Sequence, residues 1–177
     1  MNARRTDELL RNARRYTSSH PAPALSGKPV LRVAVVACMD ARLDPRGLLG
    51  LRDGDAHVIR NAGGVVTPDV IRSLTISQQL LGTTEIVLIH HTRCGMLTIT
   101  DDEFRARLRA DTGAEPDWET GAFASLEGSV QKSAARIAAS PFIVHKDSIR
   151  GFVFDVETGA LGEIPLSSGT QPPRRPK

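Results

Sequence analysis

The chain has 177 residues, a length typical of one domain with its own core. Its residues are 40% hydrophobic and 24% charged, which is a globular composition, and only 4% aromatic, which argues against a stacking platform for single-stranded nucleic acid. The net charge of +3 is carried by Arg174, Arg175 and Lys177, so the rest of the chain is neutral and no basic patch for nucleic acid is expected.

In chain order, the hydrophobic pattern predicts helices that alternate with strands. An amphipathic helix is expected at 3–16, and a Ser-, Pro- and Gly-rich connector follows it. Apolar runs and turn residues predict strands at 31–37, 57–61, 85–90 and 151–156, and an edge strand at 161–166. Capping residues and helical periodicity predict further helices that begin at Asp44, run from Thr67 to about Leu81, run from Asp101 to about Ala110, and cover 121–139.

This alternation predicts a single α/β domain with a mostly parallel sheet and helices on both faces. If the first strand lies between the second and third, the order is 2-1-3-4 plus an edge strand, and ligands are expected where the first and third strands end. We expect three regions: a protruding N-terminal helix and connector at 1–28, the α/β domain at 29–169, and a disordered basic tail at 170–177. The apolar stripe of the first helix needs a cover, either its own domain or a second subunit.

The apolar segments of the chain are short. The run from Val33 to Met39 falls far below the roughly 20 residues that span a bilayer, and no apolar signal region follows Arg4 and Arg5. Two cysteines do not form a disulfide framework. We therefore expect a cytoplasmic protein without membrane contacts.

Both cysteines and one histidine follow the two strands that flank the expected ligand site. Cys38 ends the first strand, and His91 and Cys94 end the third. Thiolate and imidazole are zinc ligands, and three protein ligands with one exchangeable position are typical of catalytic zinc. Packing explains one buried cysteine equally well, and a disulfide is a further alternative, but the three residues together favour a metal site. His90 must point to the other side of the strand.

A carboxylate and a guanidinium lie two residues apart beside the first candidate ligand. Asp40 and Arg42 can form an ion pair there, which leaves room for water, whereas Asp40 on the metal would close the site. The alternative is a solvated surface pair. A phosphatase loop is excluded, because it requires Arg six positions after Cys38 and the chain has Asp44 there.

In their order and spacing, three segments resemble the β-class carbonic anhydrases, and the resemblance extends from about residue 3 to residue 166. The segments are Cys38-Met39-Asp40-Ala41-Arg42, Arg60-Asn61-Ala62-Gly63-Gly64 and His90-His91-Thr92-Arg93-Cys94-Gly95-Met96. Relatives often carry an acidic residue at the position of Arg93, so this chain is expected to have a cation beside the site.

The resemblance implies a zinc enzyme that interconverts carbon dioxide and bicarbonate. It implies Cys38, His91 and Cys94 as ligands, and Asp40 and Arg42 as the catalytic dyad. It also implies a homodimer or larger homo-oligomer, with the active site near the interface and the N-terminal helix over the partner. Alternatives are a carbonyl sulfide or carbon disulfide hydrolase, a non-catalytic zinc-stabilised regulatory protein, and a nucleotide-binding protein.

The charge of the ligands leads to one further expectation. Two thiolates cancel the +2 charge of zinc, so water should ionise at a higher pH than the value of about 7 found in carbonic anhydrases with three imidazole ligands. Activity should therefore rise on the alkaline side. Carbon dioxide is small and apolar, so we expect a hydrocarbon-lined pocket with backbone N–H donors from Gly63 and Gly95.

Overall fold

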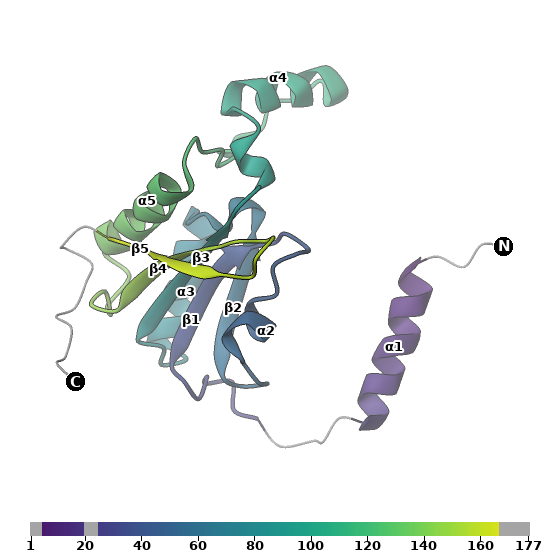
Figure 1. Cartoon of the computed structure of the whole chain (residues 1–177), viewed down its shortest axis with the longest axis vertical. Helices are drawn as coiled ribbons and strands as arrows, with labels where there is room; N and C mark the ends of the chain where they lie inside the picture. The colour runs from purple at the N-terminus through teal and green to yellow at the C-terminus, as the bar shows by residue number, and fades with distance from the viewer. Residues whose placement is uncertain (1–4, 20–24, 167–177) are drawn as a thin grey trace.

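The computed structural model describes residues 5–19 and 25–166, and Figure 1 shows their arrangement. The strands are β1 Val33–Cys38, β2 Ala56–Asn61, β3 Glu85–His91, β4 Ile149–Phe154 and β5 Leu161–Ile164. The helices are α1 Arg5–Ser19, α2 Pro45–Leu49, α3 Pro68–Gln79, α4 Asp101–Thr112 and α5 Leu126–Ala139, with two short 3-10 turns, η1 Ala62–Gly64 and η2 Gly95–Leu97.

The five strands form one sheet in the order β2-β1-β3-β4-β5. β1 is parallel to β2 and β3, β3 is parallel to β4, and β5 is antiparallel to β4. The predicted order and the predicted edge strand are therefore confirmed. The register pairs Cys38 with Asn61 and His91 with Phe154, so the carboxyl ends of β1 to β4 meet along one edge.

Helices cover both faces of this sheet, as predicted. On one face, Leu74 of α3 and Ile137 of α5 belong to the same apolar cluster as Leu88 of β3. On the other face, Leu48 of α2 packs against the cluster that contains Val35 of β1. Since both faces are covered, the central strands are apolar on both sides.

Two helices begin at the predicted capping residues. The side chain of Asp44 accepts a hydrogen bond from the Arg46 amide, and Pro45 occupies the first position of α2. Thr67 caps α3 in the same way, through its contact with the Val70 amide. These caps satisfy amides that lack partners inside the helix. They fix where the chain turns away from the carboxyl edge of the sheet.

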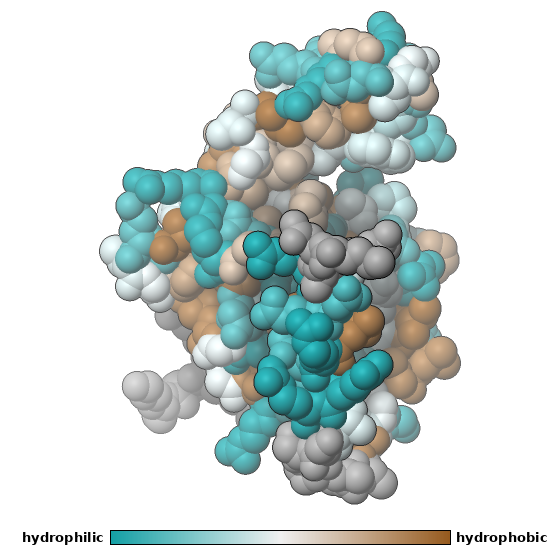
Figure 2. All heavy atoms as spheres, turned by 90° about the vertical axis from the view of Figure 1, so that its right-hand side faces the viewer, coloured by the Kyte–Doolittle hydropathy of each residue, from teal (hydrophilic) through white to brown (hydrophobic). Residues whose placement is uncertain are grey.

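The N-terminal helix α1 stands apart from the sheet, which confirms the protruding helix (Figure 1). Leu9, Leu10 and Tyr16 are all more than half exposed. In Figure 2, where α1 faces the viewer, hydrophilic side chains cover most of its outward surface. Across the described residues, no helix is both long enough and apolar enough to cross a membrane.

Several predicted boundaries are wrong. The expected helix over 121–139 begins only at Leu126: Gly121 has a φ of 76°, a left-handed value that a helix does not allow, and Ser125 caps the helix from an extended backbone by accepting a hydrogen bond from the Gly128 amide. The first strand begins at Val33 rather than Leu31, since Arg32 also has a positive φ, 57°. The fourth strand covers 149–154 instead of 151–156. The predicted tail at 170–177 lies outside the described residues.

Candidate metal centre

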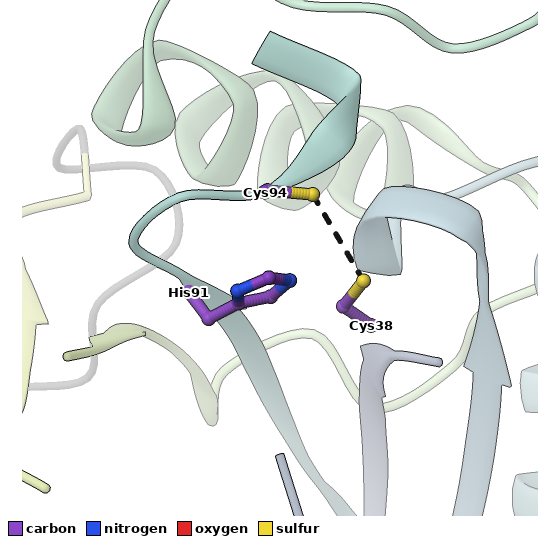
Figure 3. A group of neighbouring side chains, drawn as sticks. All are labelled: Cys38, His91 and Cys94. Carbon is purple, nitrogen blue, oxygen red and sulfur yellow. Dashed lines mark hydrogen bonds between the residues drawn. The ribbon is translucent and has the colours of Figure 1, made fainter. Parts of the chain in front are cut away.

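The structure brings the two cysteines and His91 together at the carboxyl edge of the sheet. Cys38 is the last residue of β1, His91 is the last residue of β3, and Cys94 follows three residues later. Their side chains point toward one another (Figure 3). The two sulfur atoms are 4.0 Å apart, and the three candidate ligand atoms lie within 4.8 Å of one another. All three residues are buried.

The ring of His91 is oriented by the backbone beside it. Its Nδ1 lies 2.8 Å from the carbonyl oxygen of Thr92, and because that oxygen can only accept, Nδ1 carries the proton. The other ring nitrogen, Nε2, is buried, and it has no hydrogen-bond partner among the described residues. A buried polar atom without a partner is costly, and a metal ion at Nε2 would remove that cost.

The spacing of the three side chains fits a tetrahedral divalent ion. Zinc–sulfur bonds of about 2.3 Å at a tetrahedral angle place two sulfurs about 3.8 Å apart. The observed distance between Cys38 Sγ and Cys94 Sγ is 4.0 Å. With His91 Nε2 as a third ligand, one position stays open, as in catalytic rather than structural sites.

The two thiols have different environments. Burial alone would raise the pKa of Cys38, but the neighbouring His91 and the amides of Asp40 and Gly63 lower it to about 7. Burial, together with the negative charge of Cys38, raises the pKa of Cys94 to about 11. The interaction with Cys38 in turn raises the pKa of His91. Cys38 is therefore the thiol that ionises first.

Asp40 and Arg42 form a two-contact ion pair beside this cluster. Arg42 Nε lies 2.9 Å from Asp40 Oδ1, and Arg42 Nη2 lies 2.8 Å from Asp40 Oδ2. These bonds hold the pKa of Asp40 far below its ordinary value, so the carboxylate is charged at every physiological pH. Asp40 Oδ2 is 3.6 Å from His91 Nε2. The acid thus borders the candidate metal position while the guanidinium holds it.

The loop that carries Cys38 and Asp40 is held by Arg60 on the neighbouring strand β2. Its guanidinium donates hydrogen bonds to the carbonyl oxygens of Cys38, Asp40 and Leu43 over 2.7–3.0 Å. Sequence reasoning assigned no role to Arg60, although the residue lies in one of the three motif segments. The parallel pairing of β1 and β2 was the signal that could have indicated it.

Comparison with known proteins places this geometry in a family. Residues 33–161 match the family model described as carbonic anhydrase. The β-carbonic anhydrase 1 of Mycobacterium tuberculosis is 52% identical over 159 residues, which cover 90% of this chain and 97% of that relative. The chain belongs to the β-carbonic anhydrase family. A crystal structure of the Streptococcus mutans carbonic anhydrase superimposes with a TM-score of 0.88 at 43% identity, covering 93% of this chain and 100% of the other.

The family also contains relatives with another named activity. A carbon disulfide hydrolase of Acidithiobacillus thiooxidans is 37% identical over 151 residues, which cover 73% of this chain and 75% of the relative. Membership in the β-carbonic anhydrase family therefore leaves more than one substrate to consider.

The glycines of this β-carbonic anhydrase have different surroundings. Gly64 has a φ of 67°, and a Cβ there would lie 2.7 Å from the Cys38 amide nitrogen. Gly63 is tightly enclosed as well, and its amide acts on the Cys38 sulfur. Apart from Gly95 and the residues next to it in the chain, no atom of the described residues lies within 4 Å of the position that a Cβ would take at Gly95. Of the two predicted substrate-pocket donors, Gly95 therefore has open space beside it and Gly63 does not.

The cation expected beside the site is present, and it is paired with an acid. Arg93 Nη2 lies 2.9 Å from Glu157 Oε1, so an acid of the β4–β5 turn neutralises its charge. The carbonyl oxygen of Arg93, not its side chain, contacts Arg42. The expected cation is therefore present, and its counterion is a glutamate that the sequence did not indicate.

Proposed function

We propose that this protein is a zinc-dependent carbonic anhydrase that interconverts carbon dioxide and bicarbonate. The observation that carries the proposal is the buried Cys38–His91–Cys94 cluster with the Asp40–Arg42 ion pair 3.6 Å from its imidazole. Two thiolates and one imidazole form a soft ligand set that suits zinc. The relatives named carbonic anhydrase support the choice of reaction.

The residues of the chain prepare the attack of water on carbon dioxide. When bound, zinc would lower the pKa of water and so supply hydroxide as a nucleophile at a pH well below the ordinary pKa of water. Asp40, which stays ionised, accepts a hydrogen bond from the attacking oxygen and so turns a lone pair toward the carbon atom. Arg42 holds Asp40 in that orientation by two hydrogen bonds and keeps it away from the fourth metal position. The products are bicarbonate and one proton.

The decisive experiment measures bound zinc and carbon dioxide hydration on the same sample. We expect one zinc ion per chain and a hydration rate that rises toward alkaline pH. Cys94→Ser should lose zinc and reduce kcat by more than about a hundredfold, beyond the 10–100-fold loss typical of groups outside the ligand shell. The control is His90→Gln, on the opposite side of β3, which should keep both. Bound zinc without hydration would instead support a non-catalytic zinc-stabilised protein.

Carbon disulfide is the second candidate substrate, because of the 37% identical hydrolase. Carbon disulfide and carbonyl sulfide are linear and apolar like carbon dioxide, so the same cluster could act on all three. Parallel assays of the zinc-loaded protein with the three substrates decide between them. A kcat/KM for either sulfur compound above that for carbon dioxide would replace the proposed activity.

We further propose a homodimer in which α1 lies on the partner. Its exposed Leu9, Leu10 and Tyr16 need an apolar cover. A groove of about 440 Å³ beside α3 offers one, with Ile71, Ile76 and Phe142 in its lining. Replacing Leu9 and Leu10 by Asp should convert the dimer to a monomer in sedimentation, whereas Arg14→Asp on α1 should not.

The two free cysteine thiols support a cytoplasmic location. Both cysteines are free thiols, and their sulfurs are close enough to be at risk of oxidation. A reducing compartment keeps such thiols available as ligands.

A further inference from the structure

One residue between the ligands His91 and Cys94 has an unfavourable backbone conformation. Arg93 has a φ of 56°, in the left-handed region that residues with a Cβ rarely adopt. Its carbonyl oxygen accepts a hydrogen bond from Arg42 Nη2 at 3.1 Å. The backbone at position 93 therefore supports the guanidinium that holds Asp40.

The side chain of Arg93 is held by a second loop, the turn between β4 and β5. Glu157 in this turn forms the ion pair with Arg93. The turn itself is fixed by Asp155, whose Oδ1 accepts hydrogen bonds from the amides of Glu157 and Thr158 at 2.8 and 2.9 Å. The backbone that carries Glu157 is therefore fixed by hydrogen bonds.

Two further hydrogen bonds join the same pair of loops. The Val156 amide donates to Thr92 Oγ1 at 3.1 Å, and the Thr92 amide donates to the Phe154 carbonyl at 2.9 Å. These two hydrogen bonds hold the two loops side by side in addition to the ion pair. Glu157 needs no large rearrangement to reach Arg93.

We propose that Glu157 and Arg93 are positioning residues for the catalytic Asp40, acting through Arg42. Contacts run without a gap from Glu157 to Arg93, from the Arg93 carbonyl to Arg42, and from Arg42 to Asp40. The ion pair favours the left-handed backbone at position 93 and so keeps the carbonyl oxygen turned toward Arg42. This inference rests on the proposed function, because it assigns a purpose to the orientation of Asp40.

The exposure of the ion pair limits the size of its effect. The side chains of Arg93 and Glu157 are 65% and 59% exposed, and such pairs contribute little to global stability. Loss of the pair should therefore leave the unfolding transition almost unchanged. It should instead reduce the fraction of molecules in which Asp40 is correctly oriented. A smaller active population lowers kcat and leaves KM unchanged.

The first test is the variant Glu157→Gln in the zinc-loaded protein. We expect kcat for carbon dioxide hydration to fall about two- to fivefold, the range that an exposed ion pair can supply, with KM unchanged. The matched control is Glu163→Gln, which breaks the exposed Arg150–Glu163 ion pair on the same hairpin and should leave kcat unchanged. Combining Arg93→Glu with Glu157→Arg restores an opposite-charge pair and should restore kcat.

The second test needs no substrate, so it also separates this inference from the proposed activity. Nitrogen-15 NMR of the zinc-loaded protein follows the exchange of the Arg42 Nε–H with water. We expect exchange about two- to fivefold faster in Glu157→Gln and unchanged in Glu163→Gln. Unchanged Arg42 exchange in Glu157→Gln, equal effects of the two variants, or no recovery in the charge-swapped protein would each overturn the proposal. A protein that lacks hydration activity but shows the expected exchange would contradict only the proposed function.

Discussion

Two neighbouring histidines at the end of β3 have opposite surroundings. His90 and His91 are both fully buried. His90 lies on the α5 side, where its Nε2 is 3.0 Å from Ser129 Oγ and its ring packs against Phe123. His91 lies on the other side, with Nε2 directed toward the two cysteines and free of hydrogen bonds within the described part. Strand alternation alone separates the two environments.

The difference teaches how a strand end can serve packing and chemistry at once. Burial among apolar groups lowers the pKa of His90 to about 4, so this ring stays neutral and belongs to the core. The neighbouring Cys38 raises the pKa of His91, so the protonation of this ring depends on the charge of Cys38. Changes on the His91 side should therefore affect activity, and changes on the His90 side should affect stability.

Apart from the proposed metal ligands, the largest effect is expected from Arg42, on the His91 side. Arg42→Ala removes both hydrogen bonds that hold Asp40, and the freed carboxylate can then close the fourth metal position. We expect kcat to fall about a hundredfold while zinc content stays the same. Rapid-mixing carbon dioxide hydration and metal analysis of the same samples measure both quantities.

The control for this variant is Arg107→Ala, which breaks an exposed ion pair with Asp111 on α4. Its kcat should match that of the native protein. Full turnover in Arg42→Ala would remove the positioning role, and it would make the Asp40–Arg42 pair a surface contact that happens to lie near the cluster.

A smaller effect is expected at Gly64, which lies against the ends of both β1 and β3. A Cβ at this position would lie 2.7 Å from the Cys38 nitrogen and 3.1 Å from the Ile89 oxygen, and the φ of 67° is unfavourable for alanine. Since both obstacles are backbone atoms, Gly64→Ala should reduce the free energy of unfolding by about 2 kcal/mol. Urea denaturation of the zinc-loaded protein measures this loss.

Gly82→Ala separates the two causes. Gly82 also has a positive φ, 78°, but among the described residues beyond its chain neighbours no atom lies within 4 Å of the added Cβ. We expect a loss of about 1 kcal/mol there, from backbone strain alone. Equal losses at the two positions would mean that the close approach of Gly64 to β1 carries no cost.

The sequence predicted the parts of this arrangement that depend on strand periodicity and topology. The alternation of His90 and His91, the strand order, and the meeting of Cys38 with Cys94 follow from local patterns and from the rule for parallel sheets. The function of Arg60 was missed, because its hydrogen bonds to the Cys38 loop join residues 17–22 positions apart and leave no periodic signal, so only the pairing of β1 with β2 could have indicated it.

The surroundings of Arg93 show the same limit. From the sequence, Arg93 could only be interpreted as a cation beside a ligand. Its partner Glu157 lies 64 residues further along the chain, in a turn whose position depends on the packing of β4 and β5. The amino-acid type shows the sign of the charge on a side chain, whereas only the fold shows which group pairs with it.

The smallest effect is expected on the His90 side, in the pH dependence of stability. The pKa of His90 is about 4 in the folded protein, below the value of about 6.5 in an unfolded chain. Between these values the unfolded state binds a proton that the folded state does not, so stability falls as the pH falls through this window.

His90→Gln can keep the contact with Ser129 but does not titrate. The native protein should lose about 1 kcal/mol more than this variant between pH 6.5 and 5.5, as urea denaturation at each pH measures. Because every other titrating group is common to both proteins, identical pH dependence would mean that His90 has the same pKa in the folded and unfolded states, and the contrast between the two histidines would disappear.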